Sequence, residues 1–218
     1  MTRWNRVAAL LFLTAWWIAP HHVNADDAID DAHLIDHIAT SVGRGYARMH
    51  GYKVRFQLID QRTPHTSALQ VRYEPKTRLC TFLISTNDNT WHSFEQYLKF
   101  FEGLPKQVVY EAFFAHESGH CVQLKEDIDF GPVNRRHRQE LFADVFALSH
   151  VERYFPTHRE AFQRGQYLMR RAVSGLQPDY DFSRELMRLS ASPSLLEALK
   201  VKDPQERAFS IAKAVDML

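Results

Sequence analysis

The sequence AHESGH, residues 115–120, contains three side chains whose types and spacing suit hydrolytic chemistry at a metal ion. His116 and His120 are four residues apart, so both rings would project from the same face of a helix. Glu117 would lie about 100° around that helix from His116, where it could reach a metal-bound water without occupying the metal. This HExxH arrangement is typical of sites in which two imidazoles bind zinc and the glutamate is the general base.

A catalytic zinc ion usually has three protein ligands and one open position for water. One known scheme, that of the metzincins, places a third histidine six residues after the second, with a glycine midway. In this chain those positions hold Glu126 and Gln123, so the metzincin pattern fails at both. The missing glycine matters because the turn that brings the third ligand back needs it.

The segment QELFADVFAL, residues 139–148, contains a better third ligand. Glu140 and Asp144 are four residues apart and share one face of a predicted helix. Ala143 and Ala147 are small enough to permit close approach of another helix. Nineteen residues separate His120 from Glu140, enough for one helix to end and a second to return beside it. We therefore expect Glu140 to bind the metal and Asp144 to accept the free ring N–H of a zinc-bound histidine.

Other interpretations of these residues exist. Glu126, Asp127 and Asp129 are rival third ligands, but each is more typical of a loop charge because none has a helix-spaced supporting partner. The histidines alone would be ordinary surface residues, and the two acids alone would be a solvated helix stripe. The five residues together, in this order and on these elements, favour a metal site.

The HExxH motif followed by ExxxD on the next helix resembles the gluzincin metallopeptidases, over residues 115–144. The resemblance implies a zincin-like fold and hydrolysis of a peptide or protein substrate. It implies that Zn2+ is bound by His116, His120 and Glu140. It also implies that Glu117 is the catalytic base and that Asp144 orients His116. In gluzincins an edge strand before the metal helix pairs with the substrate, and LCTFLIST, residues 79–86, is the candidate for that strand.

A tetrahedral oxyanion would need a further hydrogen-bond donor from outside the two metal helices. Four residues are available, and spacing does not choose among them: His150, Tyr154, His158 and Tyr167. Ordinary packing or surface roles are the competing interpretation of most of the four.

A second function remains open beside the peptidase. The same ligands could belong to a zinc-stabilised binding or regulatory domain that hydrolyses nothing. The presence of Glu117 favours the enzyme, because a structural site does not need a base and usually closes with a fourth protein ligand. The sequence identifies neither a protein partner nor an inhibitor.

The elements that must position these residues form an α+β pattern, with strands and helices segregated along the chain. Alternation of apolar and polar residues predicts strands near 52–59, 67–74 and 78–86, and their short connections favour an antiparallel meander. Helical spacing predicts a first helix within 26–49, and Ser93 with Gln96 forms a capping box for another. Pro105 is expected to begin the metal helix. Further helices are predicted at 135–155, 157–173, 182–190 and 193–217, the last broken near Pro204.

Residues 1–25 have the basic start, short apolar run and small-residue end of a secretory signal peptide, with cleavage expected after Ala25. The alternative is an uncleaved anchor, but the apolar run of residues 7–18 is shorter than the ~20 residues that span a bilayer. We therefore expect residues 26–218 to form a single secreted or periplasmic zincin-like domain without a stable membrane anchor. In such a compartment Cys80 and Cys121 could form a disulfide, although two buried thiols would also suit the sequence.

The charge balance excludes a nucleic-acid partner. The chain has 27 basic and 26 acidic residues, and loss of Arg3 and Arg6 with the signal peptide would leave 25 against 26. An even, near-neutral surface lacks the basic patch that nucleic-acid binding requires. The short basic runs at 135–138 and 170–171 are interrupted by acids and are predicted to be solvated.

Overall fold

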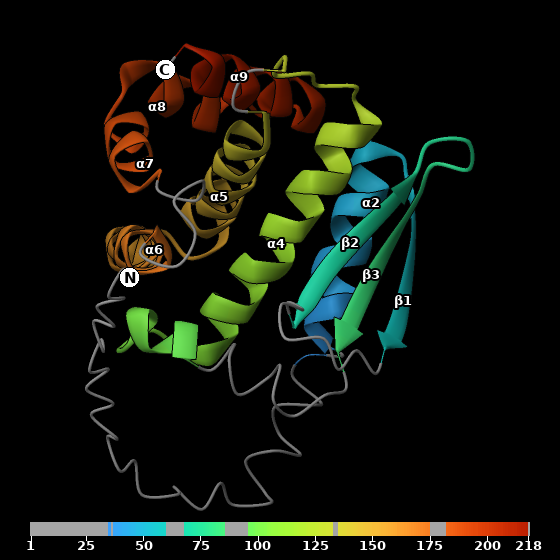
Figure 1. The fold of residues 1–218 in the computed structure, drawn as a ribbon, viewed down its shortest axis with the longest axis horizontal. Coiled ribbons are helices and arrows are strands. Elements are labelled where there is room, and N and C mark those ends of the chain that lie inside the picture. The colour runs from blue at the N-terminus through green and yellow to red at the C-terminus, as the bar shows by residue number, and fades with distance from the viewer. Residues whose placement is uncertain are drawn as a thin grey trace, which may run out of the picture.

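The computed structural model describes residue 35 and residues 37–59, 68–85, 96–132, 135–174 and 182–217. The predicted signal peptide, the beginning of the first predicted helix and Ser93 of the predicted capping box lie outside the described residues. The described part is α+β, with a three-stranded sheet on one side of a larger group of helices (Figure 1). No helix within it has the length and hydropathy needed to cross a membrane.

The sheet contains β1 (Lys53–Ile59), β2 (Leu69–Glu74) and β3 (Leu79–Ser85) in the order β1-β3-β2. β2 and β3 form an antiparallel hairpin, but β1 pairs with β3 in parallel. The three strands are therefore confirmed and the antiparallel meander is wrong. Only the connection from β2 to β3 is tight, whereas nine residues, 60–68, separate β1 from β2. β3 is apolar on both faces, which suits the central position that it occupies.

The central position of β3 also overturns its predicted role as the substrate-binding edge. Backbone groups on both sides of β3 pair with neighbouring strands, from Leu79 to Ser85 on the β1 side and from Leu79 to Ile84 on the β2 side. A peptide cannot add to a strand that already has two neighbours. The sheet edges belong to β1 and β2.

The first predicted helix is confirmed over its described part. A short π-helical segment, η1 (Ala39–Gly43), continues into α2 (Arg44–His50). The helix ends at Gly51, whose φ of 68° is the left-handed conformation that glycine adopts without strain. Ile38, Val42 and Tyr46 are buried against the sheet and the central helices.

Two long helices form the centre of the molecule (Figure 1). α4 (Lys106–Lys125) begins directly after Pro105, and α5 (Arg135–Tyr154) returns beside it. Every residue from Leu141 to Val151 on α5 is buried, so the helix is enclosed on all sides. Asp144 and His150 belong to this buried stretch, and buried polar groups of this kind require hydrogen-bond partners.

The helical C-terminal part is also confirmed. A short 3-10 turn, η2 (Lys99–Phe101), precedes α4, and another, η3 (Pro156–His158), follows α5. The remaining helices are α6 (Arg159–Ser174), α7 (Ser183–Ser190), α8 (Pro193–Lys200) and α9 (Pro204–Asp216). The break near Pro204 occurs as predicted, because Val201 has an extended backbone and the Asp203 side chain caps α9 at the amide of Glu206.

A disulfide joins Cys80 on β3 to Cys121 on α4, with their Cα atoms 6.0 Å apart. Both residues are fully buried, in the hydrophobic cluster between the sheet and the helices. Cys121 directly follows His120, so the bond attaches the end of the HExxH segment to the central strand. The sequence left this pairing open between a disulfide and two thiols.

Replacing both Cys80 and Cys121 by alanine is expected to reduce the free energy of unfolding by roughly 2–4 kcal/mol, because the unfolded chain loses a cross-link. The bond spans 41 residues, which places the expected loss toward the upper end of that range. Urea denaturation of the wild-type and double-variant chains under oxidising conditions measures the difference. Equal midpoints would contradict the expectation, and a reducing agent should destabilise the wild type alone.

Candidate metal centre

The three predicted ligands lie together. His116 and His120 project from α4 and Glu140 projects from α5, and one ligand atom of each lies within 4.8 Å of the others. The two imidazole rings are 4.9 Å apart between centroids and nearly perpendicular. Among the described residues, this is the one group of three or more histidine, cysteine or carboxylate side chains so arranged.

The distances within the group suit a tetrahedral ion. Nε2 of His116 is 3.7 Å from Oε2 of Glu140, and Nε2 of His120 is 3.8 Å from Oε1 of the same carboxylate. Zinc bonds of 2.0–2.2 Å at tetrahedral angles separate ligand atoms by about 3.4 Å. Two imidazoles and one carboxylate also form a donor set that zinc commonly takes in catalytic sites. The residues present therefore fit a zinc ion.

Asp144 fixes the orientation of His116. Its Oδ1 is 2.9 Å from Nδ1 of His116, so that nitrogen carries the proton and leaves the Nε2 lone pair directed at the ligand group. Burial acts to lower the pKa of His116, but Asp144 and the other nearby carboxylates outweigh burial and raise it. A metal ion at Nε2 therefore has to displace a proton, and its affinity should fall on acidification.

The carboxylate of Asp144 is in turn paired with Arg170 on α6. Arg170 was not among the site residues predicted from the sequence. Arg170 donates from Nε to Oδ2 and from its second terminal nitrogen to Oδ1, both at 2.7 Å. The same nitrogen is 3.4 Å from Oε2 of Glu140, and the guanidinium lies 4.5 Å from the centre of the Phe182 ring. Burial would raise the pKa of Asp144, but Arg170 and His116 lower it far below its usual range.

The prediction that residues 170–171 form a solvated basic face is wrong for Arg170, which is only 8% exposed. Arg171 is exposed, as predicted. A signal for the difference was present in the sequence, because Arg170 shares a helix face with Phe162, Gln166 and Met169, all of which are buried. Gln166 uses this face to donate to the backbone carbonyl of Asp144 at 3.0 Å.

Glu117 has the acidity expected of a general base. Burial raises the pKa of Glu117 to about 7, and the charge of Glu140 adds to this, while His116 and Arg170 oppose it. A carboxyl group with a pKa near the operating pH is well suited to accepting and returning a proton. A bound dication would act in the opposite direction and lower the pKa.

His120 has the protonation state that a ligand needs. Burial, followed by the positive charge of His116, lowers the pKa of His120 to about 4. The ring is therefore neutral at pH 7, and its lone pair is available without loss of a proton.

A close approach of α4 and α5 sets the distance from the histidines to Glu140. Gly119 lies between the two histidines, and a Cβ atom at this position would be 3.2 Å from Cα of Ala143 and 3.1 Å from Cβ of Phe146. The small residue at 143 was expected to permit this approach, but the matching glycine was not recognised. Glu140 lies one helical turn from this crossing, which brings its carboxylate to the imidazoles.

Gly119→Ala should weaken zinc binding, because the added methyl group would lie 3.2 Å from Cα of Ala143 and 3.1 Å from Cβ of Phe146, so α5 would have to shift by a few tenths of an ångström. Such overpacking costs about 1–3 kcal/mol of stability, more than the ~1 kcal/mol that alanine gains over glycine in a helix. Gly45→Ala on α2 is the matched control, since a Cβ atom there meets nothing within 4 Å. Thermal unfolding and zinc titration of both variants check the difference; equal behaviour would contradict a tight crossing.

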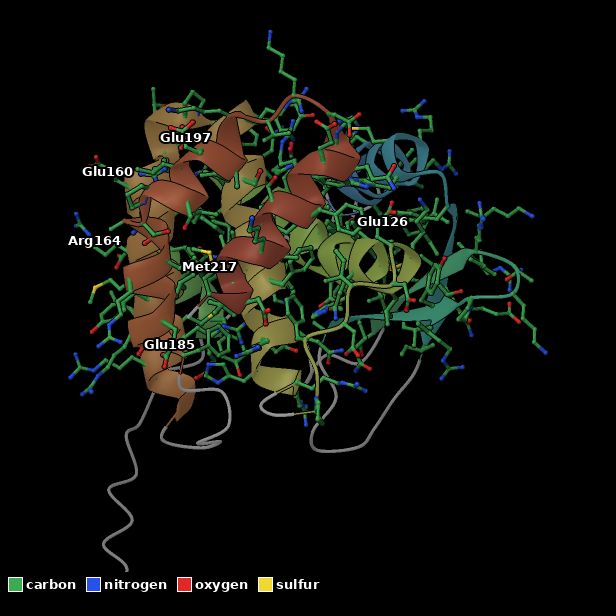
Figure 2. All side chains as sticks on the ribbon, turned by 90° about the horizontal axis from the view of Figure 1, so that it is seen from above. Glu126, Glu160, Arg164, Glu185, Glu197 and Met217 are labelled. Carbon is green, nitrogen blue, oxygen red and sulfur yellow. A yellow bond between two sulfur atoms is a disulfide. The ribbon has the colours of Figure 1, made fainter. Side chains whose placement is uncertain are left out.

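The rival ligands are engaged elsewhere. Glu126, labelled in Figure 2, lies at the end of α4. Its carboxylate accepts from Lys125 at 2.6 Å and from Gln205 of α9 at 2.8 Å. Asp129 accepts from the amide of Gly131 and from Arg135. Neither these two nor Asp127 belongs to the ligand group formed by the described residues.

The residues considered as oxyanion donors are not gathered at the metal centre. Both ring nitrogens of His150 are occupied, since Nε2 donates to Glu111 at 3.0 Å and Nδ1 accepts from the Tyr46 hydroxyl at 3.1 Å. Tyr154 packs on the His150 ring and is 49% exposed. No contact described for this part of the chain links Tyr154, His158 or Tyr167 to the ligand group.

Comparison of the chain with protein-family models, curated proteins and solved structures found no match in any of the three. Interpretation of the site therefore depends on its residues and geometry.

Proposed function

We propose that this protein is an exported zinc metallopeptidase of the gluzincin type, with a zincin-like domain. The observation that carries the proposal is the convergence of His116, His120 and Glu140 on one point, with Asp144 behind His116. The position of Asp144 supports the gluzincin type, because it accepts from Nδ1 of His116 while Nε2 of the same ring faces Glu140.

Zinc held by His116, His120 and Glu140 would lower the pKa of a bound water toward ~7 and polarise the scissile carbonyl. Glu117 accepts a proton from the attacking water and later delivers it to the leaving nitrogen of the peptide. Asp144 and Arg170 keep His116 in one tautomer and orientation throughout, because both are buried and mutually paired.

An extended substrate would pair with β2. Among the described strands β2 is at an edge of the sheet, and it is the strand that lies beside α4 (Figure 1). Its partner β3 occupies only one of its two sides. Main-chain pairing at such an edge gives affinity with little dependence on sequence, so peptides of varied sequence are the expected substrates.

The first test is the metal itself. The purified wild-type chain should contain one zinc ion. Glu140→Ala should lower the affinity for zinc by more than the 10- to 100-fold that is typical when a residue supporting a ligand is removed. Glu126→Ala is the matched control. The Glu126 side chain is 5% exposed and that of Glu140 20%, but Glu126 bonds to Lys125 and Gln205 instead of facing the histidines. Metal analysis after dialysis gives the stoichiometry. Loss of zinc in Glu126→Ala but not in Glu140→Ala would overturn the assignment of the third ligand.

A further inference from the structure

A pocket lies away from the candidate metal centre, between the C-terminal part of α5, the end of α8 and the beginning of α9. Its volume is about 460 Å³, within the range of ~300–1,000 Å³ typical of small-molecule sites. None of its lining residues belongs to the metal centre. The polar ones are Ser149, Glu152, Arg153, Lys200, Lys202 and Arg207.

The polar lining is strongly basic. Four of its residues are cationic and Glu152 is the one acid, and Oε2 of Glu152 is already 2.5 Å from Nε of Arg159, which lies outside the lining. Lys200 pairs with Glu197 of α8, labelled in Figure 2, but both side chains are more than 70% exposed and such pairs contribute little. The pocket therefore has an excess of positive charge.

Three of the cations have no carboxylate in ion-pair contact within the described part of the chain: Arg153, Lys202 and Arg207. Asp203 lies close enough to act on Arg207 electrostatically, but its carboxylate caps α9 by accepting from the amide of Glu206 at 2.8 Å. The charge of these residues is consequently available to a ligand.

Arg207 is held in place. Its Nε donates to the carbonyl of Val201 at 2.7 Å, and one terminal nitrogen donates to the carbonyl of Lys202 at 2.9 Å. These bonds use two of the five N–H groups of a guanidinium and leave three. Burial, followed by the nearby charge of Arg153, lowers the pKa of Arg207, so the two guanidinium groups repel each other. An anion between them would relieve that repulsion.

The helix dipole explains only part of this arrangement. Arg153 and Lys200 lie in the last turns of α5 and α8, where a positive charge is favourable. Lys202 and Arg207 lie beyond those turns. Ser149 adds a hydroxyl to the wall, and none of the described contacts gives that hydroxyl a hydrogen-bond partner. The pocket is thus lined by two arginines, which can each donate two parallel hydrogen bonds, and by a lysine and a serine hydroxyl. Donors of this kind bind oxyanions.

We propose that this pocket binds a small molecule carrying an oxyanion group, a phosphate or a carboxylate, held by Arg153, Lys202 and Arg207. The site shares no residue with the metal centre, so it is independent of the peptidase proposal.

Calorimetric titration of the full chain with glycerol 3-phosphate and with succinate, at an ionic strength held constant with chloride, tests the pocket. At least one probe should bind, and Arg153→Gln and Lys202→Gln should each weaken that binding about tenfold. Both side chains are exposed, so both variants should fold. Lys213→Gln is the matched control, because it removes one exposed charge of α9 outside the pocket.

The result for the two probes distinguishes a phosphate ligand from a carboxylate ligand. Equal affinity in the wild type and all three variants would mean an adventitious ion only and would overturn the proposal. Failure of both probes to bind more tightly than chloride would overturn it as well.

Discussion

Glu117→Gln should retain one zinc ion per chain and lose peptide hydrolysis by a factor of about 10²–10⁴, the usual contribution of a general acid–base group. The glutamine side chain has nearly the same shape as glutamate but cannot accept a proton from water. None of the three ligand atoms changes, so the metal stays. Metal analysis and the cleavage rate of a fluorogenic peptide, measured on the same preparation, give both quantities.

The pH profile gives a second measure of Glu117. Since only the ionised carboxylate accepts a proton, the wild-type rate should fall as the pH decreases through the pKa of Glu117. Burial raises that pKa to about 7, and a zinc ion nearby would lower it, so the acidic limb should lie at or below pH 7. Equal cleavage by the wild type and Glu117→Gln would contradict the peptidase and favour a zinc-stabilised domain without activity.

Arg170→Met should be the most destabilising single change near the site, lowering the free energy of unfolding by about 3–5 kcal/mol. The variant leaves the carboxylate of Asp144, which is only 2% exposed, without its bidentate partner. A buried charge without a partner is far more costly than an exposed one. Chemical denaturation at neutral pH measures the loss, and Arg171→Met serves as the control because that neighbour is exposed.

The pH dependence of the stability lost in Arg170→Met distinguishes an unpaired Asp144 carboxylate from lost packing. Arg170 and His116 hold the pKa of Asp144 well below the ~3.9 of an unfolded aspartate, so Asp144 stabilises the wild type above about pH 4. That contribution is lost as the pH falls below this value. The deficit of Arg170→Met should therefore shrink in acid, and adding Asp144→Asn should recover part of the stability at pH 7. A deficit that does not change with pH would point to lost packing against Phe182 instead.

The grouping of His116, His120 and Glu140 could be predicted from the sequence because its geometry is mostly local. Four-residue spacing places His116 and His120 on one helix face, and the same spacing places Glu140 and Asp144 on another. A single chain reversal between two helices then suffices to bring the faces together. Each step depends on helical periodicity, which is the strongest signal in a single sequence.

The strand order and the support from Arg170 could not be predicted in the same way. The alternation of apolar and polar residues identifies each strand but does not show which strand pairs with it. The parallel pairing of β1 with β3 depends on contacts between residues that are distant in the sequence. Arg170 follows Asp144 by 26 residues, on a helix whose docking angle no local pattern specifies. The amphipathic pattern of α6 indicates that Arg170, unlike Arg171, lies on the buried helix face, but it does not identify Asp144 as its partner.

The hydrogen bond between His150 and Glu111 has a consequence for the metal centre, because it joins the same two helices beyond the Gly119 crossing. Apolar contacts between helices have no preferred direction, so they allow one helix to slide along another. A hydrogen bond requires a particular distance and angle and therefore prevents such sliding. A slip of α5 along α4 by one turn, 5.4 Å, would break this bond and the bond between His116 and Asp144 together. The two bonds thus allow a single axial register of the helices. The spacing of His116, His120 and Glu140 is thereby set by the protein alone, so binding of the proposed zinc ion would require little rearrangement.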